Sequence, residues 1–151
     1  MHKIFETLRF NRRTYLDFLD QYSLKQLNNI PQNFNNSMIW NIIHTVVTEQ
    51  LLIYDLSGLP MKIDEEYISR FRKGTKPEKD VTAEEVLYIK NNMMKLIDMT
   101  EEDYKSGIFK NYTPYLSSTD ISLNTVDEAL KFNLFHEGIH LGVILSIKKL
   151  V

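Results

Sequence analysis

Apolar residues recur at helical spacing along four long stretches of the chain. Between residues 4 and 22, for example, Ile4, Leu8, Tyr15 and Phe18 fall on one side, because steps of three or four residues return to the same face of a helix. Similar spacing extends through residues 37–57, 82–106 and 125–151. Four long helices joined by connectors are typical of a four-helix bundle, so the pattern predicts an all-α fold.

Residues that begin and end helices mark the predicted boundaries. The pairs Thr82–Glu85 and Thr125–Glu128 have the spacing of capping boxes at helix N-termini. Gly58 follows the second helix and is suited to a left-handed cap. Proline breaks helices, and all four prolines lie between the predicted helices, at positions 31, 60, 77 and 114.

The connectors are short to medium in length, with one exception. Residues 58–81 form a connector of more than 20 residues between the second and third helices, and such loops are usually functional lids or contain local structure. Residues 23–26 carry another capping box, which predicts one short extra turn. Residues 108–112 alternate only briefly next to Pro114 and do not predict a strand.

Composition narrows the class of protein. A chain of 151 residues predicts a single domain spanning residues 1–151. Its 43% hydrophobic and 25% charged residues exclude a disordered, collagen-like or rod-shaped chain. The net charge of -2 argues against a nucleic-acid partner. Since there is no cysteine, disulfides, thiolate metal sites and cysteine nucleophiles are excluded. No signal-peptide pattern or membrane-spanning stretch is present, so we expect a cytoplasmic location without a membrane partner.

Two of the four histidines lie one helical turn apart. His136 and His140 are separated by four residues, so on a helix they point the same way, about 40° and about 6 Å apart. Two imidazoles so placed can reach one metal ion at about 2.0–2.1 Å each. His2 lies at the terminus and is assigned no role.

A third histidine lies on an inward-facing row of the second helix. The two rows that carry histidines are Trp40, His44, Val47, Leu51 and Tyr54, and Ala129, His136, His140 and Ile147. Both rows are apolar, which predicts that three histidines meet inside the bundle. They would either bind a metal or be satisfied by neighbouring polar groups, and the second alternative needs several compensating hydrogen bonds. The convergence of three favours the metal.

The segment HEGIH at 136–140 also matches the H-E-x-x-H motif of zinc metalloproteases. Residues 141–151 contain no His, Asp or Glu to supply a third downstream ligand, so proteolysis is disfavoured. Glu137 is rotated about 100° from His136. We interpret it first as a solvated surface charge, second as a group behind a ligand, and third as a base for metal-bound water.

Two asparagines lie one turn before the histidines. Asn41 precedes His44, and Asn133 precedes His136. Either could orient an imidazole or contact a substrate, although exposed asparagines on helices are common.

Four segments together resemble one family. NSMIWNIIH at 36–44, its continuation at 45–52 with Gly58, FRKGTKP at 71–77 and HEGIHLG at 136–142 are similar to the DinB-like (DinB/YfiT) superfamily of metal-binding four-helix bundles. The resemblance covers nearly the whole chain, and the ordered combination is far more specific than any single piece. Asn41 is a departure, because a histidine often precedes the ligand by three residues in this family.

The resemblance implies a divalent metal held by His44, His136 and His140. Imidazole suits Zn, Ni and Fe alike. Some branches of the family are thiol-dependent S-transferases or isomerases, which implies a metal-dependent enzyme acting on a small molecule, with thiol transfer as its reaction. The thiol must come from a co-substrate, since the chain has no cysteine. The alternatives are a non-catalytic metal-binding or stress-response protein, a metal-assisted hydrolase, and a bundle with bare histidines.

Residues 70–79 carry most of the local positive charge. They are either a basic lid that attracts an anionic small molecule or a solvated loop balanced by Asp64, Glu65 and Glu66. The run is too short to make many contacts with a phosphate backbone.

The last helix is apolar around nearly its whole circumference, which indicates burial on more than one side. Gly138 and Gly142 lie on the face away from His140. Each costs about 1 kcal/mol relative to Ala inside a helix, and close approach of another backbone would compensate. That backbone belongs to a neighbouring helix or to a second subunit. Two-fold dimers are the commonest oligomers, and the family often dimerises, so we expect a homodimer.

Overall fold

Six α-helices, one 3₁₀ turn and a small hairpin make up residues 1–151 in the computed structural model of the chain. In chain order the elements are α1 (His2–Gln21), α2 (Leu24–Asn28), α3 (Met38–Ile53), the 3₁₀ turn η1 (Asp55–Ser57), α4 (Glu65–Phe71), α5 (Ala83–Ser106), β1 (Tyr115–Leu116), β2 (Ser122–Leu123) and α6 (Val126–Ile147). The predicted all-α bundle is confirmed, and the four predicted long helices are α1, α3, α5 and α6.

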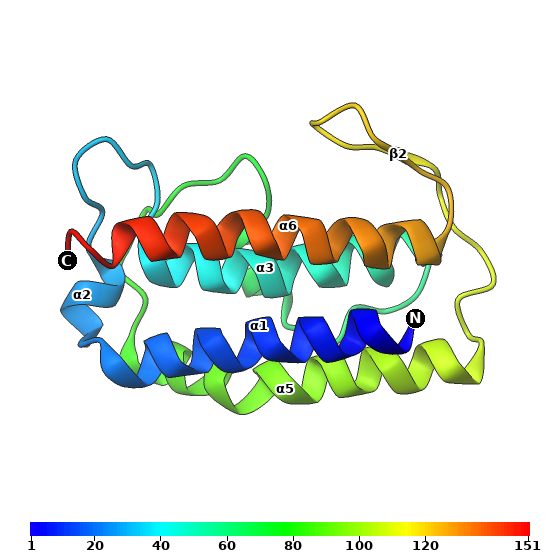
Figure 1. The fold of residues 1–151 in the computed structure, drawn as a ribbon, viewed down its shortest axis with the longest axis horizontal. Helices are drawn as coiled ribbons and strands as arrows, with labels where there is room; N and C mark the ends of the chain where they lie inside the picture. The colour runs from blue at the N-terminus through cyan, green and yellow to red at the C-terminus, as the bar shows by residue number, and fades with distance from the viewer.

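The four long helices form two layers. Figure 1 shows α3 and α6 side by side above α1 and α5, and the hairpin reaches beyond the helices near the start of α6. α6 packs against both α3 and α1. None of the helices is both long and apolar enough to span a membrane.

The helix α3 is the most deeply buried element. Of its 16 residues only Thr48 and Leu51 are not buried. Most of its apolar side chains belong to a buried cluster of 22 residues, and Leu52 and Ile53 belong to a second cluster of nine. A helix that is apolar on nearly all sides must be covered on all of them. A polar side chain on α3 is therefore held inside the bundle, and this applies to His44 in particular.

Most of the predicted helix ends are confirmed. The capping boxes at Ser23 and Thr82 are both formed, and Gly58 adopts the left-handed conformation at φ 69°. At the start of α6 the Thr125 side chain accepts from the Glu128 backbone N–H, but the Glu128 carboxylate accepts from the backbone of Asn124. The predicted box at Thr125 is therefore only half formed.

The connectors contain more structure than their sequence indicates. The second predicted helix ends at Ile53 and continues as η1. The connector 58–81 holds α4, whose seven residues are too few to show a clear helical period. The strands lie at 115–116 and 122–123, with Tyr115 opposite Leu123. Two residues per strand are too few for alternation to be visible in sequence.

Candidate metal centre

Three histidines from two helices meet between α3 and α6. His44 comes from α3, His136 and His140 come from α6, and their ligand atoms all lie within 4.8 Å of one another. The two Nε2 atoms of His136 and His140 are 3.1 Å apart. The structure thus brings together the three histidines that helical spacing places on facing rows.

Packing holds the His44 ring in place. The indole of Trp40, one turn earlier on α3, stacks on this imidazole with ring centroids 4.7 Å apart and planes 12° apart. His44 itself is 5% exposed. Its ring therefore has little freedom to turn away from the α6 histidines.

Hydrogen bonds determine which ring nitrogens are free to bind a metal. The Nδ1 of His44 contacts the carbonyl oxygen of Phe71 at 2.5 Å, and because a carbonyl only accepts, this Nδ1 carries the proton. In the same way Nδ1 of His140 donates to Oδ1 of Asn41 at 2.8 Å. Both rings are then left with an unprotonated Nε2. Metal-binding histidines commonly donate their other nitrogen to a carbonyl or side-chain oxygen in this way.

The arrangement fits a divalent ion held by three imidazoles. Two nitrogens at 2.0–2.1 Å from one tetrahedral ion are about 3.3 Å apart, close to the 3.1 Å between the Nε2 atoms of His136 and His140. The Nδ1 of His136 is buried without a partner. Three protein ligands leave a coordination position for water or substrate, as in catalytic zinc sites.

Burial keeps the three imidazoles neutral. It lowers the pKa of His136 to about 3, with the neighbouring His140 and His44 contributing. Burial, followed by the charge of His44, lowers the pKa of His140 to about 4. The pKa of His44 is lowered by burial, which outweighs its hydrogen bond to Phe71. Neutral imidazole is the form that binds metals.

These pKa shifts predict a weak dependence of metal affinity on pH between 7 and 6. Three histidines with the reference pKa of about 6.5 would lose roughly thirtyfold in affinity over this interval, because protons compete with the metal. Since the folded-state pKa values of His136 and His140 lie well below 6, we expect a loss of less than about fivefold. Competition with a chromophoric chelator at the two pH values measures it. A thirtyfold loss would show that the cluster titrates like exposed histidines.

Of the other candidate residues, only Asn41 contacts a histidine. Asn41 contacts His140 across the helix interface, whereas Asn133 donates to Glu137 at 3.3 Å and to no histidine. Both asparagines are buried. Glu137 is 0% exposed, so its interpretation as a solvated surface charge is wrong.

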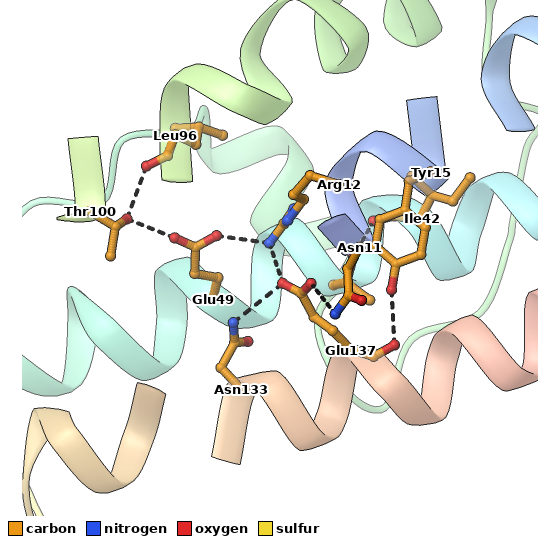
Figure 2. Close-up of polar contacts among 10 residues, drawn as sticks. Asn11, Arg12, Tyr15, Ile42, Glu49, Leu96, Thr100, Asn133 and Glu137 are labelled. Carbon is orange, nitrogen blue, oxygen red and sulfur yellow. Dashed lines mark hydrogen bonds and ion pairs between the residues drawn. The ribbon is translucent and has the colours of Figure 1, made fainter. Parts of the chain in front are cut away.

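Glu137 belongs to a buried network whose ion pairs link three helices and whose hydrogen bond from Thr100 reaches a fourth, as Figure 2 shows. The Nη2 of Arg12 on α1 lies 2.6 Å from Oε1 of Glu137 on α6 and 2.8 Å from Oε2 of Glu49 on α3. Thr100 on α5 donates to the other oxygen of Glu49 at 2.6 Å. All three charged side chains are 0% exposed. The network therefore joins the two helices that carry the histidines.

The surroundings of Glu137 disfavour its ionised form, because the side chain is buried and lies near the Glu49 carboxylate. Burial raises its pKa to about 7, and the Glu49 carboxylate acts in the same direction, while Arg12 and Asn11 oppose the shift. Its oxygens are occupied by Arg12, Asn11 and Asn133. The carboxylate is thus engaged with Arg12 and its neighbours rather than with a histidine.

Sequence reasoning did not identify Arg12 and Glu49. Both lie at positions where an apolar residue continues the inward row: Arg12 falls between Leu8 and Tyr15, and Glu49 falls between Val46 and Ile53. Opposite charges at two inward positions on different helices are a signal that could have indicated a buried pair.

A cavity of about 450 Å³ opens beside the histidines. Its walls come from α3, η1, α6, the hairpin and the segment that follows α4. All three histidines line it. A small molecule can therefore reach the nitrogens that remain available for a metal.

Some basic side chains of the segment 70–79 form ion pairs, and others line cavities without such a partner. Arg70 pairs with Glu66 and Glu85, and Lys79 lies 3.7 Å from Glu66, so much of its charge is balanced locally. Lys73 has no ion-pair partner and lines the histidine cavity. Lys76 lines a separate cavity of about 540 Å³.

Comparison with known proteins gives one family match. The model of one protein family, described as the DinB superfamily, matches residues 7–144. The match begins within α1 and ends within α6, and it includes all three clustered histidines. No curated protein matches the chain.

Proposed function

We propose that this chain, which belongs to the DinB superfamily, binds one divalent metal ion through His44, His136 and His140 and acts as a metal-dependent enzyme on small molecules. The observation that supports this most directly is the hydrogen bonding of His44 and His140. Each donates its Nδ1–H to an oxygen, which leaves Nε2 as a ligand. Zn, Ni and Fe all suit such a site.

The reaction that we favour is transfer of a thiol to an electrophilic small molecule. A metal in an open three-histidine site lowers the pKa of a bound thiol or water and so supplies a nucleophile near neutral pH. The chain has no cysteine, so the thiol is a co-substrate. The residues of the chain hold three neutral imidazoles in position and provide the cavity beside them.

A metal-assisted hydrolase is the second candidate, and one residue favours it. Hydrolysis at such a site commonly uses a carboxylate base near the metal-bound water, and Asp55 is the only carboxylate that lines the cavity. Glu137, the weak candidate for that role from the motif, is held by Arg12. A non-catalytic metal-binding or stress-response protein is the remaining alternative.

Metal analysis followed by an activity panel tests the proposal. Purified protein should hold one equivalent of Zn, Ni or Fe. The metal-loaded protein should then consume low-molecular-weight thiols in the presence of an electrophilic aryl halide, and His140→Ala should lose this activity. Ester hydrolysis without a thiol, lost in Asp55→Asn, would support the hydrolase instead. Bound metal without turnover in either assay would indicate a metal-binding protein, and absence of metal would contradict the site.

We also propose a homodimer formed through the outer face of α6, in the cytoplasm and without nucleic-acid or membrane partners. The two alternatives for the glycine face were a neighbouring helix and a second subunit. A Cβ atom added at Gly138 or Gly142 would meet nothing within 4 Å. The prediction that a neighbouring helix packs closely against these glycines is therefore wrong. Leu145 on the same face is 39% exposed. A second copy of the chain would cover this surface.

Light scattering at micromolar concentration tests the homodimer. The expected mass is twice 17.8 kDa. Gly138→Arg with Gly142→Arg should give monomers, because arginine fits the open space on the monomer but not a close helix pair. Gly138→Ala alone should raise the stability of a monomer by about 1 kcal/mol. A mass near 17.8 kDa for the wild-type chain would contradict the dimer.

A further inference from the structure

Most of the surface that side chains expose to the cavity beside the histidines is apolar. The apolar side chains that line it are Leu51, Leu52, Leu56, Phe132, Phe135 and Ile139. They come from α3, η1 and α6. A largely apolar surface with polar groups that converge on one ligand is typical of sites that bury most of a small molecule. The volume of about 450 Å³ lies within the usual range of roughly 300–1,000 Å³.

Two of these side chains remain exposed although they are large and apolar. Phe135 is 51% exposed and Ile139 is 45% exposed. Both lie on α6 within one turn of His136 and line the cavity. Apolar surface left open next to a candidate metal site is stabilised when the apolar part of a ligand covers it.

The polar side chains of the cavity are those of the three histidines, Thr48, Asp55 and Lys73 and, at the hairpin, those of Ser117, Ser118 and Thr119. At the hairpin, the Ser117 hydroxyl is already engaged by the hydroxyl of Thr119 at 3.0 Å and by the backbone N–H of Ile121 at 3.0 Å. The nitrogen atoms that a ligand can reach are those of the imidazoles and the ammonium group of Lys73, which has no ion-pair partner. The one carboxylate in the lining is that of Asp55. A ligand that fits this distribution has a polar or anionic end and an apolar remainder.

We propose that the substrate of this site is an amphiphilic small molecule. Its anionic or metal-binding end group faces the histidines and Lys73, and its alkyl or aryl body lies against Phe135, Ile139 and the leucines of α3. This inference rests on the proposed metal site and adds the substrate class. Binding of the body is driven by burial of apolar surface, so affinity increases with the length of the chain.

Straight-chain hydroxamates bound to zinc-loaded protein measure this dependence. The hydroxamate group binds zinc, and the alkyl chain is varied from acetohydroxamate to octanohydroxamate. Each buried methylene contributes about 0.8 kcal/mol, or about fourfold in affinity. We expect calorimetry to show octanohydroxamate binding at least about a hundredfold more tightly than acetohydroxamate. Lys73→Gln should weaken both probes by the same factor.

A matched pair of variants separates the cavity from general surface effects. Ile139→Ser should weaken octanohydroxamate about tenfold and leave acetohydroxamate unchanged, because only the longer chain reaches this side chain. Leu87 on α5 is 56% exposed and lies outside the cavity, so Leu87→Ser should change neither affinity.

The outcomes distinguish this inference from the proposed function. Metal content is measured before each titration. A protein that takes up no zinc overturns the proposed function and this inference with it. A zinc-loaded protein that binds both hydroxamates equally, or that responds alike to Ile139→Ser and Leu87→Ser, overturns the amphiphilic substrate alone.

Discussion

His140→Ala is expected to abolish stoichiometric metal binding while the bundle stays folded. The substitution removes one of three imidazoles and leaves His44 and His136, and two histidines hold a divalent ion weakly. Changing only a hydrogen-bond partner of a ligand typically lowers affinity tenfold to a hundredfold. Loss of the ligand itself should therefore exceed about a hundredfold. Metal content after dialysis and a chelator competition measure the loss, and circular dichroism reports the fold.

Two further variants make this result specific. His2 has a side chain that is 76% exposed and lies outside the cluster, so His2→Ala should bind metal like the wild type. Asn41→Ala removes the acceptor for His140 Nδ1 and should give an intermediate loss of tenfold to a hundredfold. Stoichiometric metal in His140→Ala would show that the three histidines do not form the site.

The helical spacing was sufficient to predict where the histidines lie. His44, His136 and His140 continue rows of apolar residues, and a row of apolar residues on a helix faces the core. The convergence of two such rows requires only that the second and fourth long helices be neighbours, and α3 and α6 are. The family resemblance had the same consequence for these three residues. For each of these histidines, the apolar residues on the same face of its own helix indicate that the side chain points into the core.

The surroundings of Glu137 could not be predicted in the same way. Its partner Arg12 is 125 residues away in the chain, and no local pattern relates the two positions. A charged residue on an apolar helix is more often exposed than buried, which is why Glu137 was interpreted as a surface charge. Whether Glu137 meets Arg12 depends on how α1 is oriented against α6. The orientation between two helices depends in turn on packing across the whole core.

The hairpin and α4 were missed for a different reason. Strands of two residues and a helix of seven residues are shorter than the windows over which periodicity can be recognised. Yet η1, the hairpin and the segment after α4 contribute Leu56, Tyr115 and Lys73 to the histidine cavity. The sequence therefore predicts the histidine cluster well and the shape of the cavity around it poorly.

Arg12→Met is expected to lower the free energy of unfolding by about 3–5 kcal/mol, as is usual when one partner of a buried ion pair is removed. Arg12 is 0% exposed and lies between two carboxylates that are also 0% exposed. Without the guanidinium, Glu49 and Glu137 would remain buried, close together and without a cation. Urea unfolding monitored by circular dichroism at pH 7 measures the change.

A neighbouring arginine and a compensated variant test the explanation. Arg9, on the same helix, pairs with Asp98 and Glu101 of α5 and is 23% exposed, so Arg9→Met should cost no more than about 1 kcal/mol. Replacing all three members of the buried network, as Arg12→Met with Glu49→Leu and Glu137→Met, should restore most of the stability, because no buried charge is left without a partner. A loss below 1 kcal/mol in Arg12→Met would show that the network contributes little to holding α3 against α6. The compensated variant also separates stability from positioning: if it folds like the wild type and binds metal more weakly, the ion pairs set the relative positions of the two helices that carry the histidines.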